Sequence, residues 1–441
     1  MSKKLILVMV FALVLAFSCA AYAEVQNVKV GGDISIWAFD RNTFNFQDVK
    51  NPASPSVDGN GLAQIANIKI AADLTDSVAA NIVLRNERLW GVANRNGGNG
   101  SAGDSDIYLA AGYVTLKEMF EQPFTLKAGT MGVRLGSGLL VGDADTNRVT
   151  TGPFNFELAD LSPRKAFTGF VGILDLKPIT ITGAALKVTE GTTTVANDDV
   201  NAYAINVGYD LAEVGMQSGI GEVYWVERAG RDANSGNTPV DNYGIRIQAS
   251  PVENFNAGAE FCYQRSKIAI ANVAGYEAAR TGGDSNTAIL LNAGYTMPDV
   301  VMAPAFSVDY TRLSKNWNAM MEDMTPADIA NVLFPNTNVQ CVGVTVAAKP
   351  MTDVGASLRY ASFRAVKEVP NGAFTSNWKA TPYTTQDNRN LGQELDLHLT
   401  YDYSEDVQFG LMGGIFMPGS AFGPDNREDA TQVIGSMKVT F

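Results

Sequence analysis

The chain has 441 residues, of which 46% are hydrophobic and 18% are charged, and its formal net charge at pH 7 is −13. This acidic balance argues against a nucleic-acid partner, because binding to phosphates requires a basic footprint. No segment after the N-terminal region has the long charge-free apolar stretch of a transmembrane helix. The chain is therefore expected either to be a soluble exported protein or to cross a membrane as a β-barrel.

The N-terminus has the pattern of a secretory signal. Two lysines precede an apolar run over residues 5–17, and Ala21-Tyr22-Ala23 supplies a small-x-small cleavage site. These features predict a signal peptide over residues 1–23 and a mature domain over residues 24–441. Two alternatives stay open: an uncleaved anchor helix, for which the run is short, and a lipoprotein signal ending at Cys19.

The mature domain offers little metal or redox chemistry. Loss of Lys3 and Lys4 with the signal changes its formal charge from −13 to −15. The two remaining cysteines, Cys262 and Cys341, lie far apart and fit no metal-ligand spacing. We expect both to be unpaired and no cofactor to be bound.

Short turns alternate with longer polar stretches along the mature domain, an asymmetry that is typical of outer-membrane barrels. Turn-forming residues predict eight tight turns, at residues 73–77, 118–122, 175–178, 210–215, 250–254, 297–300, 349–353 and 404–406. Nine longer polar stretches alternate with them, at residues 41–62, 91–105, 133–164, 190–199, 230–239, 268–284, 314–337, 368–389 and 418–429. This pattern predicts a single-domain, all-β, antiparallel transmembrane barrel of about 18 strands, with about 16 as the alternative.

The strands between these turns have one apolar and one polar phase. In residues 391–402 the apolar phase holds Leu391, Leu395, Leu397, Leu399 and Tyr401, and the polar phase holds Glu394, Asp396 and His398. An Arg or Lys that faces lipid at the membrane midplane costs roughly 2–4 kcal/mol. We therefore expect each charged phase to face the lumen.

The last strand has the same alternation up to the final residue, Phe441, with Ile434 as the one apolar residue in its polar phase. In a barrel this strand must pair with the first strand, here residues 28–40, so that no edge stays free. Its terminal aromatic is then expected at the membrane interface.

Phasing the strands, and adding one arginine from the longest loop, gives a set of candidate lumen residues: Arg85, Glu87, Lys127, Arg134, Arg246, Glu260, Asp309, Arg359, Glu394, Asp396 and His398. Charged groups that line a pore select the ions and solutes that pass. Each of these residues could instead pair with a neighbouring opposite charge and only connect the strands of the wall.

Loop 133–164 is the longest and holds Asp143, Asp145, Glu157 and Asp160 among several glycines. It could fold inward as a constriction, or bind calcium through oxygen ligands, although its spacing matches no EF-hand.

An enzyme is not expected. His398 is the only histidine and would have to be the general base. Its neighbours on the same strand face are Asp396 and Thr400, with no serine beside it on that strand. Without a second histidine or a thiolate cluster, a zinc site is not expected either.

Three segments near the C-terminus, residues 391–397, 399–403 and 409–419, resemble the C-terminal hairpin of the alginate-export porin family. They contain its G-x-E-L-D strand, its Tyr-rich strand end and its F-x-P-G exit. A second match covers residues 126–142, where Thr130 replaces a usual arginine and Arg134 could serve instead. The resemblance implies an 18-stranded monomeric outer-membrane barrel whose C-terminal end is recognised by the barrel-assembly machinery.

We therefore expect a porin-like channel for passive, selective diffusion or export of a hydrophilic solute, such as an anionic polysaccharide. It would lie in the outer membrane of a Gram-negative-type bacterium, in contact with lipid and lipopolysaccharide. For a polyuronate, the cations of a constriction would offset the lost hydration of the carboxylates. The alternative is a structural or adhesive surface protein whose barrel only anchors ligand-binding extracellular loops.

Overall fold

The computed structural model describes residues 27–47, 59–90, 107–144, 161–189, 199–232, 236–237, 239–266, 284–333, 336–369, 372–375 and 382–441. The predicted signal peptide lies outside these residues. Within them, no helix is long and apolar enough to cross a membrane.

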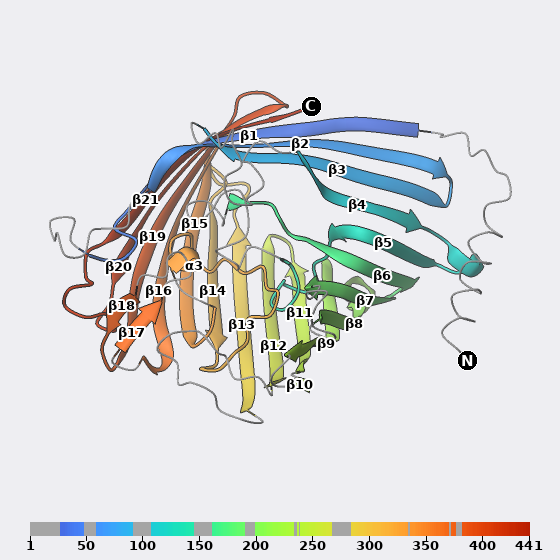
Figure 1. Ribbon diagram of the computed structural model, residues 1–441. Helices are drawn as coiled ribbons and strands as arrows, with labels where there is room; N and C mark the ends of the chain where they lie inside the picture. The colour runs from blue at the N-terminus through green and yellow to red at the C-terminus, as the bar shows by residue number, and fades with distance from the viewer. Residues whose placement is uncertain are drawn as a thin grey trace, which may run out of the picture.

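The chain forms a closed antiparallel barrel of 18 strands (Figure 1). The first nine wall strands are β1 (Asn27–Asn42), β2 (Gly59–Thr75), β3 (Val78–Leu89), β4 (Tyr108–Leu116), β5 (Phe124–Gly132), β6 (Ala166–Leu176), β7 (Ile179–Thr189), β8 (Val200–Asp210) and β9 (Ser218–Asp232). The other nine are β11 (Val240–Val252), β12 (Phe255–Ser266), β13 (Asp284–Thr296), β14 (Ala305–Leu313), β15 (Val339–Met351), β16 (Val354–Val369), β19 (Asn388–Asp402), β20 (Val407–Pro418) and β21 (Ala430–Thr440). The predicted strand count is confirmed.

Shorter elements lie in the connections between wall strands. β10 (Gly236–Asn237) pairs with the end of β9, and β17 (Gly372–Thr375) pairs with β18 (Pro382–Thr385) as a separate two-stranded sheet. Short helical turns are η1 (Met119–Glu121), η3 (Leu211–Val214) and α3 (Ala330–Leu333). The loop predicted over 368–389 is therefore partly structured, since β16 continues to Val369 and a small hairpin follows.

The first and last strands close the barrel, as predicted. β1 pairs with β2 on one side and with β21 on the other, and Asp33 lies opposite Thr440 at the start of the second ladder. Gly32 and Phe441 exchange backbone hydrogen bonds at 2.8 and 3.0 Å, and the C-terminus lies beside β1 in Figure 1. A Cβ on Gly32 would come within 2.7 Å of the Phe441 ring, so this position needs glycine.

The eight predicted tight turns all connect consecutive wall strands, and both ends of the described chain lie at that end of the barrel. The longer loops lie at the other end. Outer-membrane barrels have short periplasmic turns and long extracellular loops, so we call these ends the turn end and the loop end.

The two faces of the wall differ as the phasing predicts. On the outer face, Val308, Val344 and Leu358 are 46–47% exposed, whereas Glu394 and Asp396 on the inner face are 0% and 1% exposed. Leu391 is an error in the predicted phase. A β-bulge between β16 and β19 shifts the register at this residue, which turns Leu391 into the inner apolar cluster.

Ile434, the apolar exception of the last strand, also lies on the inner face. It packs there with Phe39, Ala63 and Ile65. Burial against these neighbours explains why an apolar residue occupies a position in the polar phase.

Two loop segments contact side chains of the inner face, and we therefore place them in the lumen. The first inner segment comprises residues 133–144, which follow β5, and the second inner segment comprises residues 314–333, which follow β14 and end with α3.

Candidate functional site in the barrel lumen

The two inner segments join each other through backbone hydrogen bonds. Val141 and Met321 form an isolated parallel bridge. The N–H of Met321 donates to the carbonyl of Leu140 at 3.1 Å, and the N–H of Gly142 donates to the carbonyl of Met321 at 2.9 Å. The longest predicted loop therefore does fold inward in its first part, while residues 145–160 lie outside the described residues.

Asp323 connects both inner segments to the residues just before β6. Arg134 and Lys165 donate to its two carboxylate oxygens, Lys165 at 2.5 Å. The N–H of Asp323 also donates to the carbonyl of Gly138 at 2.8 Å. The side chains of Arg134 and Lys165 are 50% and 41% exposed, against 18% for Asp323, so the cations of this cluster face the solvent.

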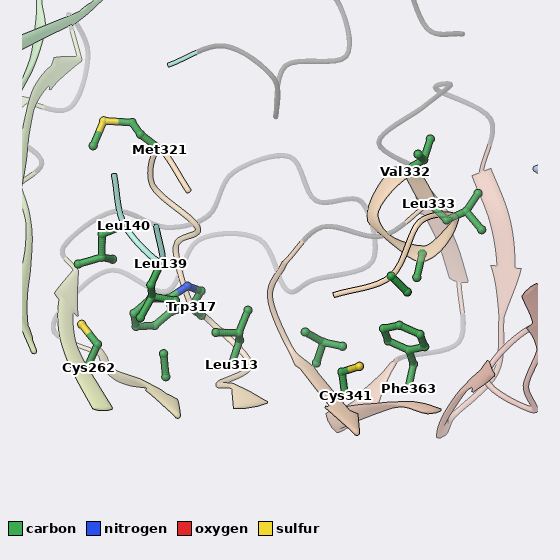
Figure 2. Close-up of a cluster of buried hydrophobic side chains, with 14 of the residues drawn as sticks. Leu139, Leu140, Cys262, Leu313, Trp317, Met321, Val332, Leu333, Cys341 and Phe363 are labelled. Atoms are coloured by element: carbon green, nitrogen blue, oxygen red, sulfur yellow. The ribbon is translucent and has the colours of Figure 1, made fainter. Parts of the chain in front are cut away.

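Apolar side chains fill the space between the inner segments and the wall. Trp317 is fully buried and lies beside Leu139 and Leu313 in Figure 2. Cys262 lies on the wall below them (Figure 2) and is buried and free, as predicted. Full burial of a large apolar side chain contributes roughly 1.5–3 kcal/mol, so this cluster holds the segments inside the barrel.

Arg359 of β16 attaches the second inner segment to the wall. Its guanidinium forms a bidentate pair with Asp309 of β14, at 2.6 and 2.9 Å. It also donates to the carbonyl of Pro326 at 2.8 and 3.1 Å. Two of the predicted lumen residues, Arg359 and Asp309, thus lie together and hold the segment in place.

Glu394 and His398 of β19 hold the same segment two residues further on. The carboxylate of Glu394 accepts the N–H groups of Ile329 and Ala330 at 2.6 and 2.8 Å, and His398 Nε2 lies 2.6 Å from the carboxylate of Asp328. Asp396, which lies between these two residues on β19, is buried as well. The acidic groups of this wall are therefore covered by the segment.

A second charged cluster spans β8 to β12. Arg246 donates to the carboxylate of Glu222 and lies 3.8 Å from that of Glu260. Glu260 also accepts the hydroxyl of Tyr224 at 2.7 Å, and Glu222 accepts the amide of Asn206 at 2.7 Å. The structure thus brings the predicted residues Arg246 and Glu260 together. The carboxylates of Glu260 and Glu222 both lie beside the Arg246 guanidinium.

A row of hydrogen-bonded side chains crosses the adjacent strands β1, β2 and β3, in a different part of the wall. Asp33 accepts Lys69 Nζ at 2.5 Å and Asn67 Nδ2 at 2.7 Å. The oxygen of Asn67 then accepts Arg85 Nε at 2.7 Å. The Lys69 side chain is 57% exposed, whereas that of Asp33 is 10% exposed.

This row continues through Glu87, whose side chain is fully buried. Its carboxylate accepts Ser162 Oγ and Arg164 Nε, both at 2.9 Å, and lies 4.0 Å from Arg85. Arg164 also stacks over the ring of Tyr108, with 4.4 Å from its guanidinium carbon to the ring centroid.

Lys127 of β5 is partly exposed and has no ion-pair partner among the residues that the structure describes. The other predicted lumen cations, Arg85, Arg134, Arg246 and Arg359, each lie within ion-pair distance of a carboxylate.

In most ion pairs of the lumen, the cationic and the acidic side chain differ in their exposure to solvent. In the pairs of Lys69, Arg134, Arg164, Lys165 and Arg246, the cation is more exposed than its carboxylate partner. Arg359–Asp309 is the reverse, at 21% against 30%. In most of these pairs the cation is therefore the more exposed member, although the chain as a whole is acidic.

Glu322 of the second inner segment is 2% exposed. Burial raises the pKa of its carboxyl group well above the ordinary value, against the opposing effect of a hydrogen bond from Asn336. The charges of Asp143 and Asp323 raise this pKa further.

Several residues of these clusters were not predicted. Asp33, Lys69 and Glu222 occupy the polar phase of their strands, so the alternation that identified Arg85 could also have found them. Asp323 and Asp328 had no such signal, because an irregular loop has no phase and its inward course depends on the rest of the barrel.

Two predictions about lumen chemistry concern His398 and a metal site. His398 pairs with the carboxylate of Asp328, and in the described part of the chain no group of three or more His, Cys, Asp or Glu residues could hold a metal ion. Of the predicted calcium ligands, Asp145, Glu157 and Asp160 lie outside the described residues.

Comparisons with known proteins support the fold. No family model and no curated protein matches the chain. Among solved structures, OccK9 (OpdG) of Pseudomonas aeruginosa superposes with a TM-score of 0.60 at 13% identity, over 95% of this chain and 99% of that one. The outer membrane protein OprD of P. aeruginosa gives 0.54 at 13% identity, over 96% and 97%.

A third similar structure is P. aeruginosa OpdK, solved with vanillate, with a TM-score of 0.56 at 12% identity over 95% of this chain and all of that one. These neighbours are substrate-specific porins of the OccK/OprD type, which are channels and not enzymes. The resemblance to alginate-export porins was therefore wrong. Its short C-terminal motifs lie on the wall strands β19 and β20, and alternation with aromatic residues at the strand ends is general to outer-membrane barrels. What the comparisons establish is the architecture, an 18-stranded outer-membrane-type barrel like that of the OccK/OprD porins.

Proposed function

We propose that the protein is an outer-membrane channel for passive diffusion of small hydrophilic solutes, with a preference for anions. The outer-membrane location is supported by the apolar outer face of the closed barrel. It is also supported by the fold shared with the outer membrane protein OprD.

The observation that carries this proposal is the junction of the two inner segments within the lumen. Val141 and Met321 bridge there, and the second segment continues to Arg359 and Glu394 on another part of the wall. A lumen divided in this way favours small solutes over a polymer.

The preference for anions follows from which charges reach the solvent. Lys69, Lys165 and Arg134 are 41–57% exposed, and Lys127 lacks an ion-pair partner among the described residues. The carboxylates of Glu87, Glu222, Glu260 and Glu394 are buried. Fixed exposed cations attract an anion and offset its lost hydration. The neighbour OpdK was solved with vanillate, a carboxylate.

Ion selectivity in planar bilayers tests the proposal. The wild-type channel should give discrete conductance steps and a reversal potential on the anion side in a salt gradient. Replacing Lys69, Lys127 and Lys165 with Gln should move that potential toward cations. As a matched control, Lys29, Lys117 and Lys177, which are exposed near the turn end, should tolerate the same change with a much smaller shift.

Two results would contradict the proposal. A barrel that conducts no ions would instead fit the alternative of an anchor for surface loops. A cation-selective wild-type channel would mean that the buried carboxylates, not the exposed cations, control the passage.

A further inference from the structure

Two arginines that face outward lie in one row at the loop end of the barrel. Arg312 of β14 and Arg364 of β16 both lie in register with Gln340 of β15, which is between them. These three side chains are on the outer face, because the adjacent Thr311 and Phe363 are buried on the inner face.

The row lies where the apolar band of the outer face ends. On β16 the outward residues from Val354 to Ser362 are uncharged, and Leu358 and Tyr360 among them are 46% and 40% exposed. Arg364 follows Val354 by ten residues. At about 3.3 Å per residue and a tilt of about 40°, this separation is about 25 Å along the membrane normal. That is about the height of the apolar band of an outer-membrane barrel.

The row therefore lies at the level of lipid headgroups. It is at the loop end, because β14 leads into the second inner segment and β16 leads into the connection that holds β17 and β18. Long loops are extracellular in such barrels, so the adjacent headgroups are those of the outer leaflet.

No carboxylate neutralises these arginines within the described residues. Arg312 donates only a long hydrogen bond, 3.4 Å, to Thr287, and the bulge in β19 places Asn390 opposite Arg364. Glu368, the next acidic residue in the outward phase of β16, lies four residues beyond Arg364, or about 13 Å along the strand.

Another part of the same rim has the opposite character. Arg265 of β12 lies in register with Asp241 of β11, which lies in register with Glu227 of β9. Two carboxylates thus accompany one arginine there, and an anionic headgroup would be repelled.

We propose that Arg312, Gln340 and Arg364 form a binding site for a phosphate of lipid A in the outer leaflet. Neighbouring strands are about 4.8 Å apart, so the two arginine backbones are about 10 Å apart and both guanidinium groups can reach one phosphate. A phosphate monoester carries about two negative charges, which the two arginines balance, and Gln340 supplies an amide donor between them. The acyl chains would lie along the apolar rows below, at Val342 and Tyr360.

This site rests on the outer-membrane location proposed above but not on what crosses the lumen. Native mass spectrometry of the intact barrel in detergent, titrated with diphosphoryl lipid A, tests it. The R312Q/R364Q variant should lose about tenfold or more in affinity, because two charge-assisted contacts are removed. The matched R265Q variant should bind as the wild type does, and R312K/R364K should retain part of the affinity.

Three controls distinguish a specific phosphate site from misfolding and from general attraction of anionic lipid. Conductance of R312Q/R364Q should equal that of the wild type, which shows that the barrel is folded and that channel function is a separate question. Unchanged lipid A binding by R312Q/R364Q would overturn the site, as would an equal loss in R265Q. Equal binding of phosphatidylglycerol or of dephosphorylated lipid A would overturn the assignment to the lipid A phosphate.

Discussion

Replacement of Asp323 with Asn should loosen the junction of the two inner segments. The change keeps the shape of the side chain but removes the charge that Arg134 and Lys165 share. The hydrogen bond from the Asp323 N–H to Gly138 stays. The variant therefore tests the charged contacts without removing the backbone contact.

The size of the effect follows from the exposure of the partners. A hydrogen bond to a charged group contributes about 1.5–3 kcal/mol when shielded from water, but exposed ion pairs contribute about 0.2–1 kcal/mol. Arg134 and Lys165 are 50% and 41% exposed, so about 1 kcal/mol per contact is appropriate. A total of about 2 kcal/mol raises the population of the separated junction about 30-fold.

Single-channel recording in planar bilayers measures both consequences of D323N. Transitions to a higher conductance level should become more frequent, because the junction separates more often. Anion selectivity should rise as well, because two cations are released. D299N, which removes a charge from the exposed turn after β13, should change neither quantity. Wild-type gating and selectivity in D323N would refute the role given to this cluster.

Three further predictions concern other parts of the barrel. Gly32→Val should lower the yield of heat-modifiable, folded barrel on gels, because its side chain would meet the Phe441 ring, whereas Gly413→Val, with no atom within 4 Å of a Cβ, should fold normally. In the folded protein the pKa of Glu322 is raised above 4.5. The free energy of unfolding is therefore largest when this carboxyl group is protonated. Amide protection around residue 322, corrected for intrinsic exchange, should be greatest below about pH 4.5 and fall as the pH rises toward the raised pKa, and E322Q should remove this dependence. Arg246→Gln leaves two carboxylates, Glu222 and Glu260, without their cation, whereas Arg359→Gln leaves one, Asp309. The reversal potential should therefore shift further toward cations in R246Q than in R359Q. An equal or smaller shift in R246Q would contradict this.

Local patterns predicted the wall of the barrel well. Turn residues located all eight tight turns, and alternation placed Glu394 and Asp396 on the inner face. It failed at Leu391, because a bulge moves one residue out of phase without any marker other than the neighbouring Gly392, whose φ is +132°. The motifs that suggested alginate export were also wall features, and for that reason they did not identify the family.

The candidate site was predicted only in part. Arg246 and Arg359 were correctly placed on the inner face, but their partners decide what they do. Asp309 comes from a strand two positions away, and Pro326 comes from a loop. The sequence did not indicate that these arginines connect the wall to the second inner segment.

The sequence by itself predicted a barrel of about 18 strands, the closure of β1 on β21 and the face on which most strand residues lie, with Leu391 as an exception. These follow from a period of two along the chain and from the cost of charge in lipid, both of which are local. Only the tertiary structure decided that the two inner segments meet at Val141 and Met321, and that in most lumen ion pairs the carboxylate is less exposed than its cation. Those features depend on contacts between residues that are far apart in the chain, and no periodicity records such contacts.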